Sequence, residues 1–160
     1  MPIVVQMNSS RRSIFTSVIA FPAMVFSAVR GDDVKYIGGT VTEIPQGTDG
    51  SLFIDQAIGL KFESKKGAFE VPFDRISSLE YGQKAGRRIG VAILVNPLFL
   101  LSKKRKHFVT IGYKDRTGVQ QGIVLELSKG LPAKVITIVE ARSGVKCEYE
   151  SEEARKHLHG

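Results

Sequence analysis

The chain has 160 residues, of which 42% are hydrophobic and 24% charged. This length is enough for one domain with a real core and too short to expect two. Its 16 glycines and its many Val, Ile and Phe residues favour β structure. A single cysteine excludes an internal disulfide, and the formal net charge of +7 favours anionic partners.

The N-terminal residues 1–28 have the pattern of a secretory signal peptide. Two arginines at 11–12 precede an apolar stretch over 14–26, and small residues follow, with cleavage expected after Ser27. The stretch is shorter than the roughly 20 residues of a spanning helix, and translation could begin at Met7. A cleaved signal, an uncleaved signal anchor and an amphipathic or β segment of the domain all stay open. Both signal interpretations predict an exported domain, periplasmic or extracellular.

From Val34 onward, apolar and polar residues alternate with a period of two, as they do in half-buried strands. In one of these segments, Ile58, Leu60 and Phe62 are expected on the buried face. Pro72 lacks an amide donor, which places its strand at an edge of the sheet or at a bend. The strands expected in this half of the chain cover residues 36–44, 51–55, 57–64, 68–73 and 76–82.

The second half of the chain predicts a hairpin followed by a helix. Residues 107–113 and 119–127 are expected to be two strands, joined by a turn that Gly118 closes. After them the period changes, and apolar residues recur at i, i+4, i+7 and i+8, on one face of a helix. These residues are Leu131, Val135, Ile138 and Val139.

The ends of this helix also carry signals. Ser128 is expected to cap its start and Gly144 to end it, with Pro132 tolerated in the first turn. Residues 145–150 are expected to add a terminal strand. The charged residues 151–160 are expected to form a flexible tail.

This order of elements predicts a mainly β fold with one C-terminal helix. The expected architecture is a pleckstrin-homology-like (PH-like) bent antiparallel sheet or barrel of about seven strands, capped by the helix. A lipocalin-like or other small barrel is the alternative. The domain is expected to cover residues 34–150, with an insert at 86–106.

A resemblance to a known family rests on several stretches of sequence. VPFDRISSLEYG carries an apolar–Pro–aromatic–x–x–Ile–x–x–Leu pattern, which resembles a signature of bacterial PH-like domains. Together with KYIGGT, GLKFES, LSKKRKHFVTIGYKD and ARSGVK, it resembles a family of uncharacterised bacterial proteins, roughly from Lys35 to Tyr149. Members of that family often carry an export signal, and the family has no assigned activity. The resemblance therefore implies a fold and a compartment.

The insert is unusual for a small β domain. It has the sequence GRRIGVAILVNPLFLLSKKRK, in which residues 89–101 are apolar apart from one Gly, one Asn and one Pro. As a helix this apolar run would span about 20 Å, short of the roughly 30 Å hydrocarbon core of a bilayer. Pro97 disfavours a continuous helix. Two short apolar arms are therefore expected, with both basic clusters at the same end.

We interpret the insert as a shallow contact loop, with an apolar tip and flanking cations that meet an anionic lipid surface or an envelope protein. The apolar residues expected to insert are Leu94, Val95, Leu98, Phe99 and Leu100. The cations expected to make contact are Arg87, Arg88, Lys103, Lys104, Arg105 and Lys106. The alternative is a structural protein-interaction subunit in which residues 89–101 belong to the ordinary core.

No other group of residues predicts chemistry. The basic run has no interleaved aromatic residues on which bases could stack, so a nucleic-acid partner is not expected. His157 and His159 have no third metal ligand placed by spacing, and Cys147 has no base placed beside it. We therefore expect no cofactor, metal or catalytic set, and a non-catalytic binding module of the cell envelope.

Overall fold

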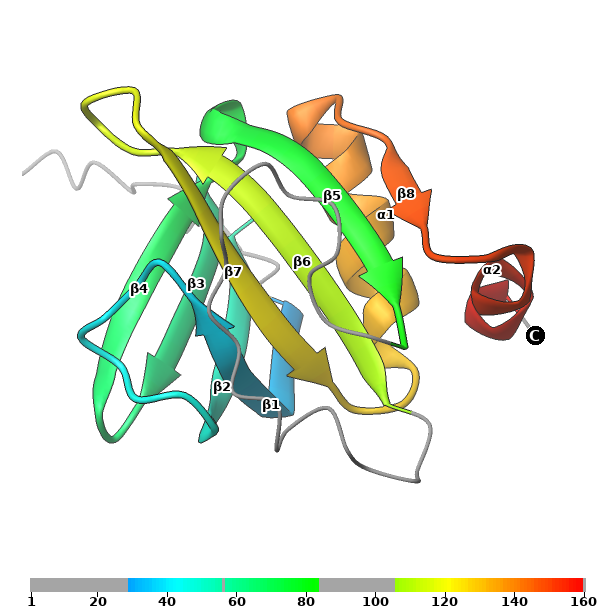
Figure 1. The fold of residues 1–160 in the computed structure, drawn as a ribbon, viewed down its shortest axis with the longest axis horizontal. Coiled ribbons are helices and arrows are strands. Elements are labelled where there is room, and N and C mark those ends of the chain that lie inside the picture. Colours follow the sequence, from blue (N-terminus) through cyan, green and yellow to red (C-terminus); the bar gives the residue numbers. More distant parts are fainter. Residues whose placement is uncertain (1–28, 56, 84–105, 160) are drawn as a thin grey trace, which may run out of the picture.

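The computed structural model describes residues 29–55, 57–83 and 106–159, and Figure 1 shows their arrangement. The predictions for the signal segment 1–28 and for most of the insert (84–105) lie outside the described residues. The elements are β1 (Val29–Gly39), β2 (Thr48–Asp55), β3 (Gly59–Ser64), β4 (Gly67–Pro72), the 3-10 helix η1 (Phe73–Arg75), β5 (Ile76–Gly82), β6 (His107–Lys114), β7 (Gln120–Leu127), α1 (Leu131–Ser143), β8 (Cys147–Tyr149) and α2 (Glu152–His159).

The described strands form one sheet in the order β4-β3-β2-β1-β7-β6-β5-β8. Neighbouring strands are antiparallel, except that β8 runs parallel to β5. The strand that contains Pro72 lies at an edge, as its missing amide donor predicts. The first strand is shifted from its expected position, because it ends at Gly39 and the chain from Thr40 to Gly47 is a loop.

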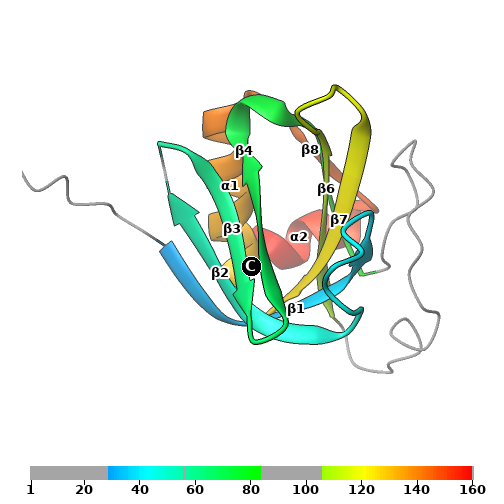
Figure 2. The same cartoon turned by 90° about the vertical axis from the view of Figure 1, so that its left-hand side faces the viewer.

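The sheet bends along β1. This strand pairs with β2 on one edge and with β7 on the other, and the register shifts between Gly31 and Val34 in the first pairing and between Tyr36 and Gly38 in the second. Such irregularities bend a strand and increase its twist. Figure 2 shows the result: β2, β3 and β4 form one layer, β5, β6 and β7 form the facing layer, and α1 lies across the opening between them.

The core fills the space between the two layers. On one side, the Phe62 and Phe69 rings are stacked with centroids 5.1 Å apart, and the Tyr36 ring meets Phe69 edge-on at 5.7 Å. From α1, Val135 and Val139 are fully buried in the same hydrophobic core. The largest fully buried side chains are Tyr36, Tyr81, Phe62, Ile37, Ile44, Leu52, Ile54, Leu60, Leu79, Ile111, Ile123 and Leu125.

The two ends of α1 differ in how well the sequence predicts them. Gly144 follows the helix with φ 74°, so the predicted glycine stop is confirmed. The predicted cap at Ser128 is wrong, because the helix starts after Gly130 in a left-handed conformation (φ 86°) and has no side-chain cap. Ser128 instead accepts the Leu131 N–H through its backbone carbonyl at 3.2 Å.

Two further expectations are corrected. Ile58 lies in the turn before β3 with 54% of its surface exposed, so it is not on the buried face with Leu60 and Phe62. The predicted flexible tail contains α2, in which Ala154 is 2% exposed and packs against the core. A buried alanine on an otherwise polar helix gives a contact that hydropathy alone does not indicate.

The predicted fold class is confirmed. The domain is mainly β, with a bent sheet and one main helix, α1, in the C-terminal part of the chain. This arrangement is consistent with a PH-like fold. The described sheet has eight strands rather than about seven, because β8 adds a short parallel edge. The sheet does not close into a barrel, since β4 and β8 are the two ends of the strand order.

We expect Phe62→Ala to lower the free energy of unfolding by about 3–5 kcal/mol, because it removes a fully buried ring from the aromatic cluster and leaves a cavity. Urea unfolding followed by circular dichroism measures the change. Val119→Ala is the control, since Val119 is 57% exposed and should change stability by less than about 0.5 kcal/mol. Equal losses for both variants would contradict this assignment of the core.

Candidate functional site

The predicted contact residues lie almost entirely outside the described part of the chain. This applies to the cations Arg87, Arg88, Lys103, Lys104 and Arg105, and to the apolar residues Leu94, Val95, Leu98, Phe99 and Leu100. The exception is Lys106, which directly precedes β6. The structure does describe the two points at which the insert joins the sheet, and we call residues 81–83 and 106–108 the root of the insert.

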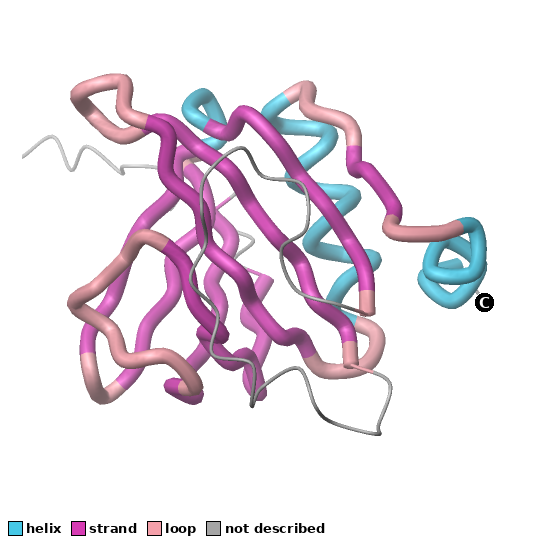
Figure 3. The backbone as a smooth tube through the Cα atoms, in the orientation of Figure 1, coloured by secondary structure: helices cyan, strands magenta, loops and turns pink. Residues whose placement is uncertain are grey.

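The root is formed by two adjacent strands. β5 and β6 pair along their length, with Gly82 opposite Phe108 and Tyr81 opposite Val109. The chain therefore leaves the sheet at Gln83 and returns at Lys106 side by side, at the lower right of Figure 3. The other edge of β5 pairs with β8, and the other edge of β6 with β7.

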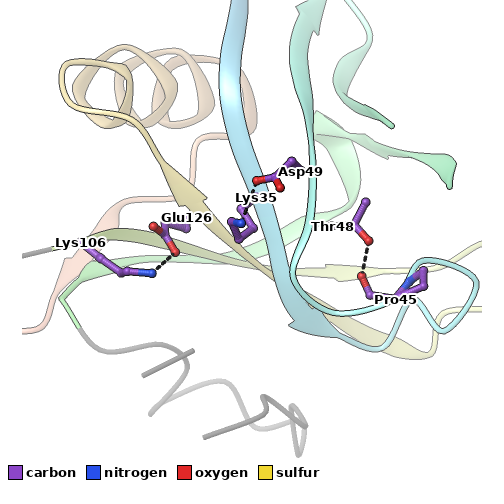
Figure 4. A network of polar contacts seen from close by, with 6 residues as sticks. All are labelled: Lys35, Pro45, Thr48, Asp49, Lys106 and Glu126. Atoms are coloured by element: carbon purple, nitrogen blue, oxygen red, sulfur yellow. Dashed lines mark hydrogen bonds and ion pairs between the residues drawn. The ribbon is translucent and has the colours of Figure 1, made fainter. Parts of the chain in front are cut away.

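Lys106 forms an ion pair inside the domain. Its Nζ lies 2.8 Å from Glu126 Oε2 on β7, and both side chains are about three-quarters buried (24% and 21% exposed). Figure 4 shows this pair beside a second one, in which Lys35 Nζ of β1 lies 2.8 Å from Asp49 Oδ1 of β2. Lys106 thus holds the start of β6 to β7, and its charge is compensated.

A groove of about 370 Å³ lies beside these ion pairs, between β1, β2 and β7. Its charged lining residues are Asp33, Lys35, Asp49 and Glu126. Three carboxylates therefore accompany one ammonium group in this groove. The sheet surface next to the root therefore has no excess of positive charge in this groove.

The C-terminal segment holds the other side of the root. The Gln83 N–H donates to Glu150 Oε2 at 2.7 Å, and the Glu150 N–H donates to the Tyr81 carbonyl at 2.9 Å. Gly82 makes room for this contact, since a Cβ on residue 82 would lie 2.7 Å from Glu150 Oε2 and 2.8 Å from Glu150 Cβ. The pairing of β8 with β5 brings these residues together.

Three aromatic rings pack together at the root. Tyr81 Oη and His107 Nδ1 are hydrogen-bonded at 2.6 Å, and their rings lie 6.1 Å apart at an interplanar angle of 20°. Tyr149 meets Tyr81 edge-on at 6.2 Å. His107 is therefore a partly buried member of this cluster. Tyr81 is 1% exposed and belongs to the core.

Cys147 lies in β8 close to this cluster, and its side chain is buried. Its N–H donates to Glu140 Oε1 at 2.8 Å. Burial, and after it the negative charges of Glu140 and Glu80, raises the pKa of the Cys147 thiol to about 12. The thiol is therefore protonated at neutral pH and is not a thiolate nucleophile.

The described residues contain neither a metal-binding cluster nor a membrane-spanning helix. Within residues 29–55, 57–83 and 106–159, no group of three His, Cys, Asp or Glu side chains is placed to hold a metal ion. None of the helices in this part of the chain is long and apolar enough to cross a membrane.

Neither protein-family models nor curated proteins match the sequence. Among solved structures, 18 chains match. One of them comes from the structure of the Spt16D–Pob3N heterodimer, with 13% sequence identity and a TM-score of 0.47. The match covers 78% of this chain, and this chain spans 56% of that one. A likeness at this level carries no inference about function.

We expect Gly82→Ala to destabilise the domain by about 1–3 kcal/mol, because the added methyl group would displace the Glu150 side chain from the root. Amide hydrogen exchange should show faster exchange at Gln83, whose N–H would lose its carboxylate partner. Ser77→Ala, on an exposed position of the same strand, is the control. Unchanged stability and unchanged exchange at Gln83 would refute the role of Glu150 at the root.

We expect stability to fall as the pH rises from 8 to 9.5. The unfolded thiol ionises near pH 8.5, whereas Cys147 in the folded state keeps its proton until about pH 12. The unfolded state therefore binds fewer protons in this range, and each rise in pH favours unfolding, by about 1 kcal/mol in total. Urea midpoints measured at both pH values give the change.

Cys147→Ala is the matched variant for this measurement, because Cys147 is the single cysteine of the chain. Its midpoint should depend less on pH between 8 and 9.5 than that of the wild type. Unfolded tyrosines, with a pKa near 10, are about a quarter ionised at pH 9.5. The raised pKa of buried Tyr36, about 12, therefore adds a smaller slope of the same sign, which is shared by both proteins and cancels in the comparison. Identical slopes for the two proteins would contradict the prediction.

Proposed function

We propose that the protein is a non-catalytic binding module that contacts an anionic membrane surface through the insert at 86–106. The observation that carries this proposal is the distribution of charge. Residues 84–105 hold six lysines and arginines and no acidic residue, whereas the rest of the chain from residue 29 onward holds 15 basic and 16 acidic residues. The basic character is thus concentrated in the insert and, with two arginines, in residues 1–28.

The geometry of the root supports a single contact surface. The insert leaves and re-enters the sheet at residues that face each other, Gly82 and Phe108. Arg87 and Arg88 follow Gly82 by at most six residues, and the basic residues 103–105 precede Phe108 by at most five. A chain spans at most about 3.6 Å per residue, so both clusters stay within about 20 Å of the root. They can therefore act together on one anionic surface.

The magnitudes are sufficient for peripheral binding. Each Lys or Arg near an anionic bilayer contributes about 1 kcal/mol, so the five cations at 87, 88 and 103–105 would contribute about 5 kcal/mol. Burying 200 Å² of the apolar run would add about 5 kcal/mol more, at about 25 cal/mol per Å². Lys106 is left out of this sum because its charge is compensated by Glu126.

The alternative role, in which residues 89–101 are ordinary core, meets a restriction in the sheet. Both edges of β5 and both edges of β6 are already paired, so the insert cannot extend the sheet beside its own root. As core, the segment would have to pack on a face of the sheet or reach a distant edge strand. This restriction favours the contact loop.

We also propose that the domain is exported, on the basis of the signal-like pattern in residues 1–28. The bounds of the first strand are compatible with cleavage at the expected point. β1 begins at Val29, so cleavage after Ser27 would leave the described sheet intact. An exported domain would meet anionic lipid head groups at the membrane surface.

We expect the full chain to sediment with vesicles that contain anionic phospholipid, and to do so less at high salt, since the cations of the insert are screened. The triple variant Lys103→Ala, Lys104→Ala, Arg105→Ala should bind about 100-fold more weakly, because it removes about 3 kcal/mol of attraction. Vesicles of zwitterionic lipid should bind both proteins weakly. Co-sedimentation at several lipid concentrations measures these differences.

The control is a variant with the same loss of charge elsewhere: Lys65→Ala, Lys66→Ala, Lys134→Ala, all at exposed positions. It should bind anionic vesicles nearly as well as the wild type. If the wild type stays in the supernatant under every condition, the lipid proposal fails, and residues 89–101 are better treated as core. If both triple variants lose binding equally, the attraction belongs to total charge and the insert is not the contact surface.

A further inference from the structure

A second cationic site lies at the opposite end of β6 from the root. There, a groove of about 260 Å³ runs between the end of β4, η1 and the β6–β7 turn. Its charged lining residues are Glu70, Arg75, Lys114, Asp115 and Arg116. β6 begins at the root with His107 and ends in this groove with Lys114. Eight residues of strand place the two regions about 23 Å apart, at opposite ends of the domain (Figures 1 and 3).

The three cations of this groove are not held in ion pairs, although two carboxylates share its lining. Ion pairs in the described part of the chain join Lys35, Lys61, Lys106 and Arg155 to carboxylates. Within these same described residues, Arg75, Lys114 and Arg116 make no ion pair and no side-chain hydrogen bond. With three cations and two carboxylates, the lining has one more positive than negative charge, and its cations are available to a bound anion.

One of the two carboxylates in the groove is already engaged. Asp115 Oδ1 accepts the N–H groups of Thr117 at 2.8 Å and Val119 at 3.0 Å, and the Thr117 hydroxyl at 2.6 Å. Its Oδ2 accepts Gln121 Nε2 at 3.0 Å. Led by the Thr117 hydroxyl, these donors hold the pKa of Asp115 at about 2. The carboxylate of Asp115 therefore stabilises the β6–β7 turn and fixes the backbone that carries Lys114 and Arg116.

We propose that this groove binds a phosphoryl group of the monoester type. Such a group carries about two negative charges near neutral pH and has three acceptor oxygens. The planar guanidinium groups of Arg75 and Arg116 can each donate two parallel hydrogen bonds to it, and Lys114 adds a point charge. A single carboxylate would offset fewer of the charges. This proposal is independent of the insert, because the groove uses other residues at the other end of β6.

The phosphoryl group can belong to free phosphate or to a lipid head group. Two exposed aliphatic side chains near the groove allow these sources to be distinguished. Val119 lies on the β6–β7 turn and is 57% exposed. Ile58 is 54% exposed, and its carbonyl accepts the N–H of Phe73, at the start of η1, at 3.2 Å. A lipid would place its acyl region against such side chains, whereas free phosphate would not need them.

The first test is a titration of the full chain with inorganic phosphate, followed by two-dimensional ¹H–¹⁵N NMR. Sodium chloride at matched ionic strength is the reference. We expect saturable shifts at the amides of residues 75 and 114–116, and at least tenfold weaker binding by the variant Arg75→Gln, Arg116→Gln. Lys65→Gln, Lys66→Gln removes two exposed cations of the β3–β4 turn and should bind as the wild type does. The same spectra show whether each variant is folded.

The second test uses vesicles of zwitterionic lipid with phosphatidic acid, whose head group is a phosphomonoester. All proteins in this test carry the insert variant Lys103→Ala, Lys104→Ala, Arg105→Ala, so that lipid binding by the insert does not enter the result. A lipid source predicts that binding is lost with Arg75→Gln, Arg116→Gln and weakened by Val119→Ser. Phosphate saturation with no such vesicle binding assigns the site to free phosphate.

The proposal is overturned if neither inorganic phosphate nor phosphatidic acid binds in a way that depends on Arg75 and Arg116. Shifts that do not saturate, or that chloride reproduces, would show general screening of surface charge. The same holds if the Lys65→Gln, Lys66→Gln control loses as much binding as the arginine variant. None of these outcomes bears on the insert, whose own test uses different residues and different variants.

Discussion

Strand β1 joins the two halves of the domain, because its two edges hydrogen-bond to different layers. One edge pairs with β2, and through it with the layer of β3 and β4; the other pairs with β7, and through it with β6 and β5. The irregular register at Gly31–Val34 and again at Tyr36–Gly38 turns one strand through the angle between these layers. The space that the aromatic core fills and the opening that α1 covers both depend on that bend.

Alternation of apolar residues predicts most of the strands because each strand has one face in the core. The same signal fails at Ile58, where alternation continues into a turn and the side chain is exposed. The helix-capping signal fails at Ser128, because the left-handed Gly130 precedes the helix and no side chain caps it. The contact of Gln83 with Glu150 spans 67 positions of sequence, so no local pattern could reveal it. The root is a product of tertiary pairing.

The charges of the domain are arranged along one axis. Near the root, ion pairs and carboxylates leave the sheet surface without an excess of positive charge. At the far end of β6, three cations outnumber two carboxylates around a groove. If both proposals hold, a single rigid strand separates a lipid-facing loop from a phosphoryl site. The domain would then hold two anionic groups at a set distance, which suits a connector better than a simple anchor.

The parallel pairing of β8 with β5 has a consequence for how the root of the insert is completed. The pairing of β5 with β6 needs no residue beyond Lys114, because these two strands follow one another in the order of described elements. The carboxylate that secures Gln83 arrives only with residue 150, after α1. A domain generally folds as a unit, so the root of the insert is complete only when β8 has paired with β5. Residues 147–150 therefore complete the root from the C-terminal end of the chain, through the pairing of β8 with β5 and the carboxylate of Glu150.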